Sequence, residues 1–209
     1  MKTLHTIAPE VSNADFFARY AAPGRVGLGG LSSWVDRAIR KSQRRLDPDA
    51  SWSLWSHAFL LEGPRIDGQQ WLLESDLDLH SHFVRLGVQE NRVDKYLDHA
   101  EAPTLAIVDF GLNATQTRAV LTEGLQLLAT GARYSIPKVI ASWVALKREK
   151  LGKRYGRADE RAIYCSAFVH HCYAAAGVDL LPGVVEDNAL PELLWSSPVP
   201  HQAWLLARA

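Results

Sequence analysis

The segment that most constrains the fold of this chain lies at residues 161–180. Its apolar residues recur at helical spacing, and its run of alanines favours a helix. Gly177, followed by the β-branched Val178, is typical of the end of a helix. We therefore predict a helix over residues 164–176.

This predicted helix carries Cys165 in its first turn. The unpaired N–H groups there and the positive end of the helix dipole stabilise a thiolate, so a cysteine at this position is placed for nucleophilic attack. A small buried hydrophobe is the alternative, because free cysteine is among the most buried residue types. That alternative suits Cys172, which lies about 10 Å further along the helix, too far from Cys165 for a disulfide.

Composition limits the class of protein. The chain has 209 residues, of which 47% are hydrophobic, and this length and composition predict one domain. It carries no net charge, which argues against a nucleic-acid partner. It has no secretory signal and no apolar run long enough for a transmembrane segment. We therefore expect a cytoplasmic protein by default, with export by a signal-independent route as the alternative. Its two cysteines agree with a reducing compartment.

The remaining patterns predict a mixture of helices and strands. Helices are expected at residues 34–45, 93–100, 115–131 and 190–195, and a short helix or a docking arm at residues 13–20. Strands are expected at residues 25–28, 51–62, 70–76, 85–91, 104–110 and 202–206. The basic segment 147–157 is expected to be an exposed loop. Within one domain, 1–209, we expect an N-terminal arm at 1–22, a core at about 23–181 and a C-terminal extension at 182–209.

A predicted hairpin brings an imidazole to a carboxylate. Folding the chain about the turn at residues 63–68 places His57 opposite Glu74 or its immediate neighbours, and residues directly opposed in a sheet have Cβ atoms about 5 Å apart. A slip of one residue would favour Ser75 instead of Glu74, and a shift of two residues would favour Asp76.

Other histidines offer alternatives. His80 and His82 are candidates for orienting His57 or for a metal pair, but no third ligand lies at a recognisable spacing, so we expect no metal and no cofactor. His170 and His171 lie on the sides of the predicted helix and are expected to be structural or exposed.

These residues fit one kind of catalysis. A cysteine nucleophile needs a base that takes its proton, and the base works better when a third group orients it. Cys165, His57 and Glu74 supply these three roles from a helix and two adjacent strands.

Three segments that carry these residues resemble a known family. They read Ser-His-Ala-Phe-Leu at residues 56–60, Trp-Leu-Leu-Glu at 71–74 and Tyr-Cys-Ser-Ala-Phe-Val at 164–169. In this order they resemble the circularly permuted papain-fold hydrolases of the NlpC-type superfamily. The YiiX/YaeF-like group is nearest, and lecithin retinol acyltransferase is a more distant relative. A glycine-rich turn and helix at 27–38 and a Gly-x-x-Tyr element within 128–134 extend the resemblance.

Two departures from the family pattern bear on the substrate. The Gly-Asp dipeptide that is common at the family's first strand reads Gly24-Arg25 here, and the basic segment 147–157 lengthens the approach to the cysteine helix.

The resemblance implies an α+β fold with a permuted papain-like core. A small antiparallel sheet would carry His57 and Glu74 and would pack against the helix that presents Cys165. It also implies a bacterial cysteine hydrolase, an amidase or peptidase or an acyl-amide or ester hydrolase, that forms an acyl-thioester on a small peptide or acyl-amide substrate. Tyr164, Ser166 and Ser56 are the candidates for oxyanion or substrate contacts, beside the backbone N–H of Cys165. An acyltransferase and an inactive papain-like binding module are the alternatives.

Overall fold

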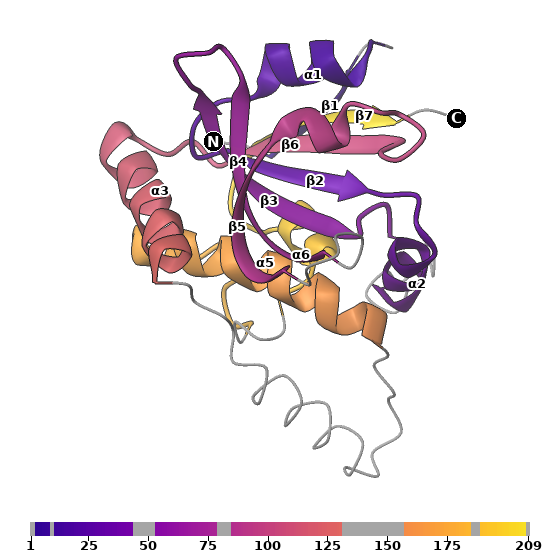
Figure 1. Cartoon of the computed structure of the whole chain (residues 1–209). Helices are drawn as coiled ribbons and strands as arrows, with labels where there is room; N and C mark the ends of the chain where they lie inside the picture. The colour runs from indigo at the N-terminus through magenta and orange to yellow at the C-terminus, as the bar shows by residue number, and fades with distance from the viewer. Residues whose placement is uncertain are drawn as a thin grey trace, which may run out of the picture.

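The protein is built on a mixed seven-stranded sheet. The structure, a computed structural model, describes residues 3–8, 11–43, 53–78, 85–130, 157–184 and 189–207. The strand order is β1-β7-β6-β2-β3-β4-β5 (Figure 1). The strands are β1 (Leu4–Ile7), β2 (Val26–Gly30), β3 (His57–Pro64), β4 (Gln70–Asp78), β5 (Arg85–Arg92), β6 (Thr104–Asp109) and β7 (Gln202–Ala207).

This sheet is larger than the small antiparallel sheet that the resemblance implied. Neighbouring strands are antiparallel except for β1 and β7, which run parallel. β1 was not predicted, because its four exposed residues carry no alternation of buried and exposed positions. It lies at the edge of the sheet, so pairing with β7 gives it its extended conformation.

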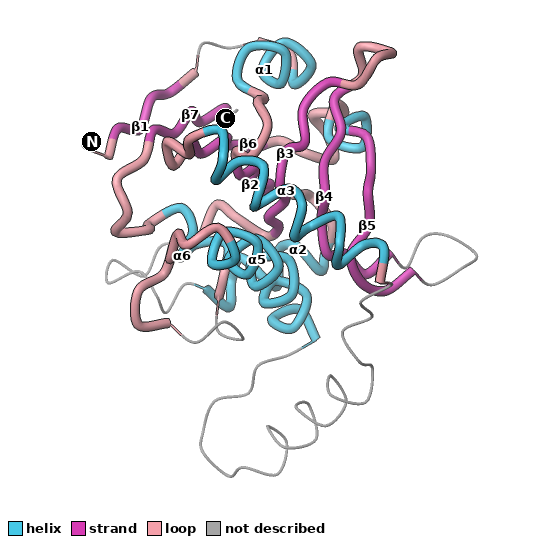
Figure 2. The backbone as a smooth tube through the Cα atoms, turned by 90° about the vertical axis from the view of Figure 1, so that its left-hand side faces the viewer, coloured by secondary structure: helices cyan, strands magenta, loops and turns pink. Residues whose placement is uncertain are grey.

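Helices cover both faces of the sheet. α1 (Asn13–Tyr20) lies on one side, whereas α5 (Arg157–Ala175) and α6 (Pro191–Trp195) lie on the other (Figures 1 and 2). α3 (Ala114–Ala129) packs against α5, and α2 (Trp34–Ser42) packs near the same helix. A short 3-10 helix, η2 (Val93–Tyr96), follows β5.

Burial on both faces explains the continuous apolar run of β3. Ala58 and Leu60 pack into the core cluster that contains Phe168 of α5. Phe59 and Leu61 pack into the cluster that contains Phe16 and Phe17 of α1. Each successive side chain of the strand therefore meets a covered face, as period-two alternation requires.

Most of the predicted elements are confirmed. α2 begins after Ser33, whose side chain accepts a hydrogen bond from the backbone N–H of Asp36 and so caps the helix. The helix predicted at 93–100 is only the four-residue turn η2. Segments 44–52, 79–84 and 131–156 lie outside the described residues, and with them lie His80, His82, Tyr134 and most of the basic segment.

Candidate active site

The structure brings His57 and Glu74 into direct contact. The Nε2 atom of His57 lies 2.8 Å from Oε2 of Glu74, and the two residues are 1% and 0% exposed. His57 is the first residue of β3, and Glu74 lies in the middle of β4. In a site buried from solvent, a carboxylate strongly orients an imidazole ring.

A β-bulge puts these two side chains on the same face. Near the turn, Gly63 pairs with Trp71, whereas beyond Glu62 the pair is Leu61 with Leu72, so β3 contains one extra residue. The register beyond the bulge sets Glu74 opposite Phe59, on the face that His57 shares. Without the bulge, the register near the turn would have sent the Glu74 side chain to the other face.

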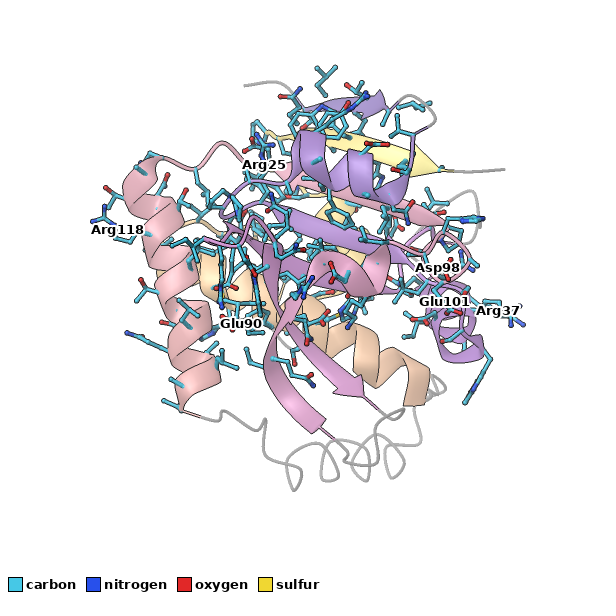
Figure 3. The ribbon with its side chains drawn as sticks, turned by 45° about the horizontal axis from the view of Figure 1, so that its top comes forward. Arg25, Arg37, Glu90, Asp98, Glu101 and Arg118 are labelled. Atoms are coloured by element: carbon cyan, nitrogen blue, oxygen red, sulfur yellow. The ribbon has the colours of Figure 1, made fainter. Side chains whose placement is uncertain are left out.

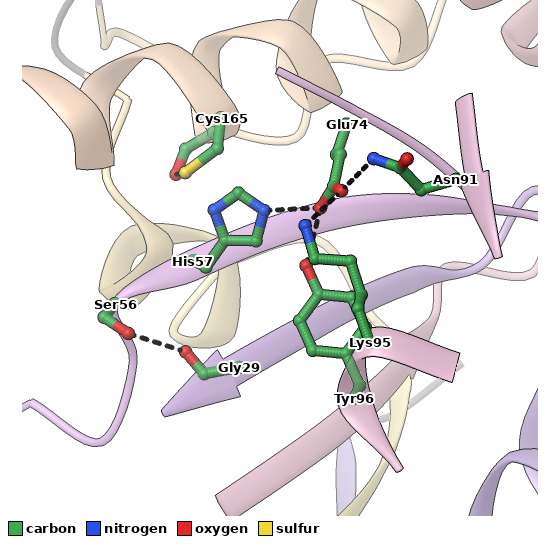
Figure 4. Close-up of polar contacts among 9 residues, drawn as sticks. Gly29, Ser56, His57, Glu74, Asn91, Lys95, Tyr96 and Cys165 are labelled. Atoms are coloured by element: carbon green, nitrogen blue, oxygen red, sulfur yellow. Dashed lines mark hydrogen bonds and ion pairs between the residues drawn. The ribbon is translucent and has the colours of Figure 1, made fainter. Parts of the chain in front are cut away.

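Three further side chains donate to Glu74. Its Oε1 atom accepts from Asn91 at 2.6 Å and from Lys95 at 2.5 Å, and its Oε2 atom accepts from the hydroxyl of Tyr96 at 2.5 Å (Figure 4). The carboxylate thus receives donors from β5 and η2 as well as from His57. These hydrogen bonds hold the carboxyl group in one orientation.

Sequence reasoning missed these three residues. One signal was present: Gln89 and Asn91 alternate as polar residues on a strand predicted to follow that of Glu74. β5 pairs Gln89 directly with Glu74, which places Asn91 on the diagonal of the same face. No sequence pattern indicates the contacts of Lys95 and Tyr96 with Glu74. They arise because the tight turn of η2 after β5 brings both residues back over β4.

The aromatic rings of Phe59 and Tyr96 pack beside the imidazole of His57. The ring of Tyr96 lies 4.6 Å from that of Phe59 and 6.3 Å from that of His57, between centroids, and both pairs are nearly parallel. Gly27 of β2 makes room for this stack, because a Cβ atom at that position would lie 1.9 Å from the Phe59 ring. The orientation of His57 is therefore fixed by packing as well as by its hydrogen bond.

Cys165 approaches His57 from α5. In Figure 4 the ring of His57 lies between Cys165 and Glu74, with the nitrogen that does not contact Glu74 on the side of the cysteine. Cys165 is 0% exposed, and its Sγ atom lies 3.8 Å from Oγ of Ser166. A thiol, an imidazole and a carboxylate from three elements are thus adjacent.

The prediction that Cys165 lies in the first turn of its helix is wrong. α5 begins at Arg157, about two turns before Cys165, because most of residues 157–162 are good helix formers, which our prediction left outside the helix. The backbone N–H of Cys165 therefore lies within the hydrogen-bond ladder of the helix. This position therefore gives no support for activation of the Cys165 thiol by the start of the helix, or for an oxyanion contact from its N–H.

The other predicted site residues differ in their surroundings. The Oγ atom of Ser56 donates to the carbonyl of Gly29 at 3.2 Å and accepts from the N–H of Leu31 at 3.0 Å, so this serine ties β3 to the end of β2. Ser166 is fully buried beside Cys165. The side chains of Tyr164 and Asp76 lie outside the described residues, and Ser75 is on the face of β4 opposite Glu74.

Of the residues expected to be structural or exposed, Cys172 and His170 are buried and His171 is half-exposed. Cys172 is 0% exposed and packs among apolar side chains. His170 is buried, with Nε2 3.9 Å from Asp179, and His171 lies 3.1 Å from Glu123 on α3.

In the described parts of the chain, no three His, Cys, Asp or Glu side chains gather as they would around a metal ion. The described helices include none with the length and apolar character needed to cross a membrane.

Comparison with known proteins identifies the fold. No protein-family model and no curated protein matches the sequence. The crystal structure of metalloprotein YiiX from Escherichia coli O157:H7 is similar, with a TM-score of 0.51, 13% sequence identity and coverage of 91% of this chain and 98% of that chain. Because the described donors here do not form a metal site, we derive no chemical step through a metal. The chain has a YiiX-like fold, as its sequence motifs predicted.

Proposed function

We propose that this protein is a cysteine hydrolase in which Cys165 attacks an amide or ester carbonyl. The observation that supports this proposal is the place of the His57 ring, which contacts Glu74 through Nε2 and presents its other nitrogen to Cys165 (Figure 4). This is the arrangement of nucleophile, base and orienting acid that activates a thiol.

The first half of the reaction forms an acyl-enzyme. His57 takes the thiol proton of Cys165 while its Nε2–H donates to Glu74. The sulfur then bonds to the carbonyl carbon, and the π electrons move to the oxygen. When the carbonyl re-forms, the bond to the leaving group breaks, His57 protonates that group and a thioester remains.

The second half consumes water. His57 removes a proton from a water molecule, the hydroxide adds to the thioester carbonyl, and the carbon–sulfur bond breaks. The sulfur recovers its proton from His57, and the carboxylic acid leaves. We propose peptidyl or acyl amides as substrates, and an acceptor other than water would give acyl transfer by the same steps.

Thiol labelling tests the proposal. The native protein is treated with iodoacetamide at neutral pH, and the modified residue is identified by mass spectrometry in the wild type, in His57→Ala and in Cys172→Ala. Because a thiol beside a base reacts as the thiolate, Cys165 should react roughly tenfold or more faster than Cys172, and His57→Ala should abolish this difference. Cys172→Ala should behave as the wild type.

The opposite result identifies a binding module. If Cys165 and Cys172 react equally, and only after denaturation, the cysteine is not activated and the hydrolase proposal is wrong. If labelling supports activation, hydrolysis of a panel of peptide amides and acyl esters should follow, and Cys165→Ala should lower turnover by several orders of magnitude while the protein remains folded.

A further inference from the structure

Lys95 connects the surface of the protein to its buried carboxylate. The lysine side chain is 35% exposed, whereas that of Glu74 is 0% exposed, and the Nζ atom lies 2.5 Å from Oε1. The oxygen that Lys95 contacts is not the one that contacts His57 (Figure 4). The lysine thus pairs with Glu74 without displacing the imidazole.

We infer that Lys95 is a positioning residue whose positive charge allows Cys165 to form a thiolate at neutral pH. This inference rests on the proposed cysteine hydrolase and adds a residue that the three-residue scheme does not contain. The inference follows from the formal charges of Lys95, Glu74, His57 and Cys165, which lie together in this site.

The count of charges shows why the cation matters. The reactive state needs a thiolate on Cys165, an imidazolium on His57 and a carboxylate on Glu74, which together carry a net charge of about −1. Burying a net charge is unfavourable, and Lys95 makes the group neutral.

Without Lys95, the site would be electrically neutral in a different protonation state. Cys165 would keep its proton while His57, as an imidazolium, paired with the carboxylate of Glu74. Removing the cation therefore raises the pH at which the thiolate forms.

Two other donors to Glu74, on neighbouring elements, are uncharged side chains. Tyr96 of η2 and Asn91 of β5 donate to Glu74 as neutral groups. On α5, Cys165 and Ser166 face the site without a formal positive charge. Among the described ion pairs, Lys95 is the lysine or arginine that contacts Glu74.

The test measures the pH dependence of alkylation. The rate at which iodoacetamide modifies Cys165 is followed between about pH 5 and about pH 9 in the wild type, Lys95→Arg, Lys95→Met and Lys95→Gln. The two neutral variants should move the midpoint upward by about one pH unit, which lowers the rate about tenfold on the acid side. Lys95→Arg should keep the wild-type midpoint.

A matched control removes one positive charge far from the site. Arg118 points outward from α3 (Figure 3), and Arg118→Met should leave the midpoint unchanged. Circular dichroism and thermal unfolding identify any variant that is not folded. Lys95→Gln provides a second neutral side chain, one that can still donate a hydrogen bond, if Lys95→Met is unstable.

The outcomes separate this inference from the proposed function. A wild-type midpoint in folded Lys95→Met or Lys95→Gln overturns the role of Lys95, and so does an equal shift in Lys95→Arg, which would mean that shape rather than charge matters. If wild-type Cys165 titrates as an ordinary thiol and His57→Ala does not change it, the hydrolase proposal itself fails.

Discussion

The imidazole of His57 meets Glu74 on a diagonal of the β3–β4 ladder and not directly across it. The register beyond the bulge places Glu74 opposite Phe59, two residues along the strand from His57, yet the two side chains are 2.8 Å apart. Diagonal neighbours on one face have Cα atoms about 7–8 Å apart, a gap that a long side chain can span. The length of the glutamate is therefore part of the site.

Replacing this carboxylate should cost stability. Glu74→Gln keeps the shape but removes the charged acceptor of Lys95 and Tyr96, so the free energy of unfolding should fall by about 2–3 kcal/mol. Urea denaturation measures this loss. The control is Glu90→Gln, which removes the more exposed ion pair with Arg65 and should cost about 1 kcal/mol or less. Equal losses in the two variants would contradict the buried network.

The bulge should depend on Gly63. This residue has a φ of +105°, and an added Cβ atom would lie 2.8 Å from Cγ of Pro23, so Gly63→Ala meets both backbone strain and a clash. We expect a loss of about 2–3 kcal/mol in unfolding free energy. Gly68→Ala, where φ is +74° and the space is open, meets only the strain and should lose about 1 kcal/mol. A larger loss at Gly68 than at Gly63 would refute this account.

Gly27 and Phe59 should be energetically coupled. Gly27→Ala forces the Phe59 ring out of its place beside Tyr96 and should destabilise the fold by about 1–3 kcal/mol. The smaller side chain in Phe59→Leu should accommodate the new methyl group. A double-mutant cycle of unfolding free energies should therefore give a loss smaller than the sum of the two single losses. Strict additivity would show that the ring does not fill this space.

Docking of β1 should weaken in acid. The Nε2 atom of His5 lies 3.0 Å from that of His201, and burial, followed by the charge of His201, lowers the pKa of His5 below its ordinary value of 6.5. The folded state binds this proton more weakly than the unfolded state does. The contribution of His5 to stability is therefore present above about pH 6.5 and is lost as the pH falls through the lowered pKa.

Hydrogen exchange measures this effect. The N–H of Leu4 donates to the carbonyl of His201, just before β7, at 2.9 Å, and the N–H of Ala8 donates to the carbonyl of Leu205 in β7 at 2.7 Å. Both N–H groups should lose protection between about pH 7 and about pH 5.5 after correction for intrinsic rates. His5→Gln should remove the pH dependence. Equal protection of the wild type at both pH values would show that the histidine pair does not control the strand.

The sequence predicted much of this architecture from local patterns. The helix α2, the strands β2 to β6 and the short helix α6 follow from periodicity and capping residues, which are properties of neighbours along the chain. The start of α5 was missed because four of the six residues 157–162 are charged and follow a basic segment, although most of the six are good helix formers.

Sequence alone identified Cys165, His57 and Glu74 as candidates for one site, because their types and order fit a thiol, a base and an orienting acid. Only the tertiary structure decided how two of them meet and what surrounds them. One extra residue at Glu62 selects the face of β3, and the turn of η2 brings Lys95 over β4. A bulge and a charge pair between distant elements depend on pairing energies across the sheet, which no local pattern of residues encodes.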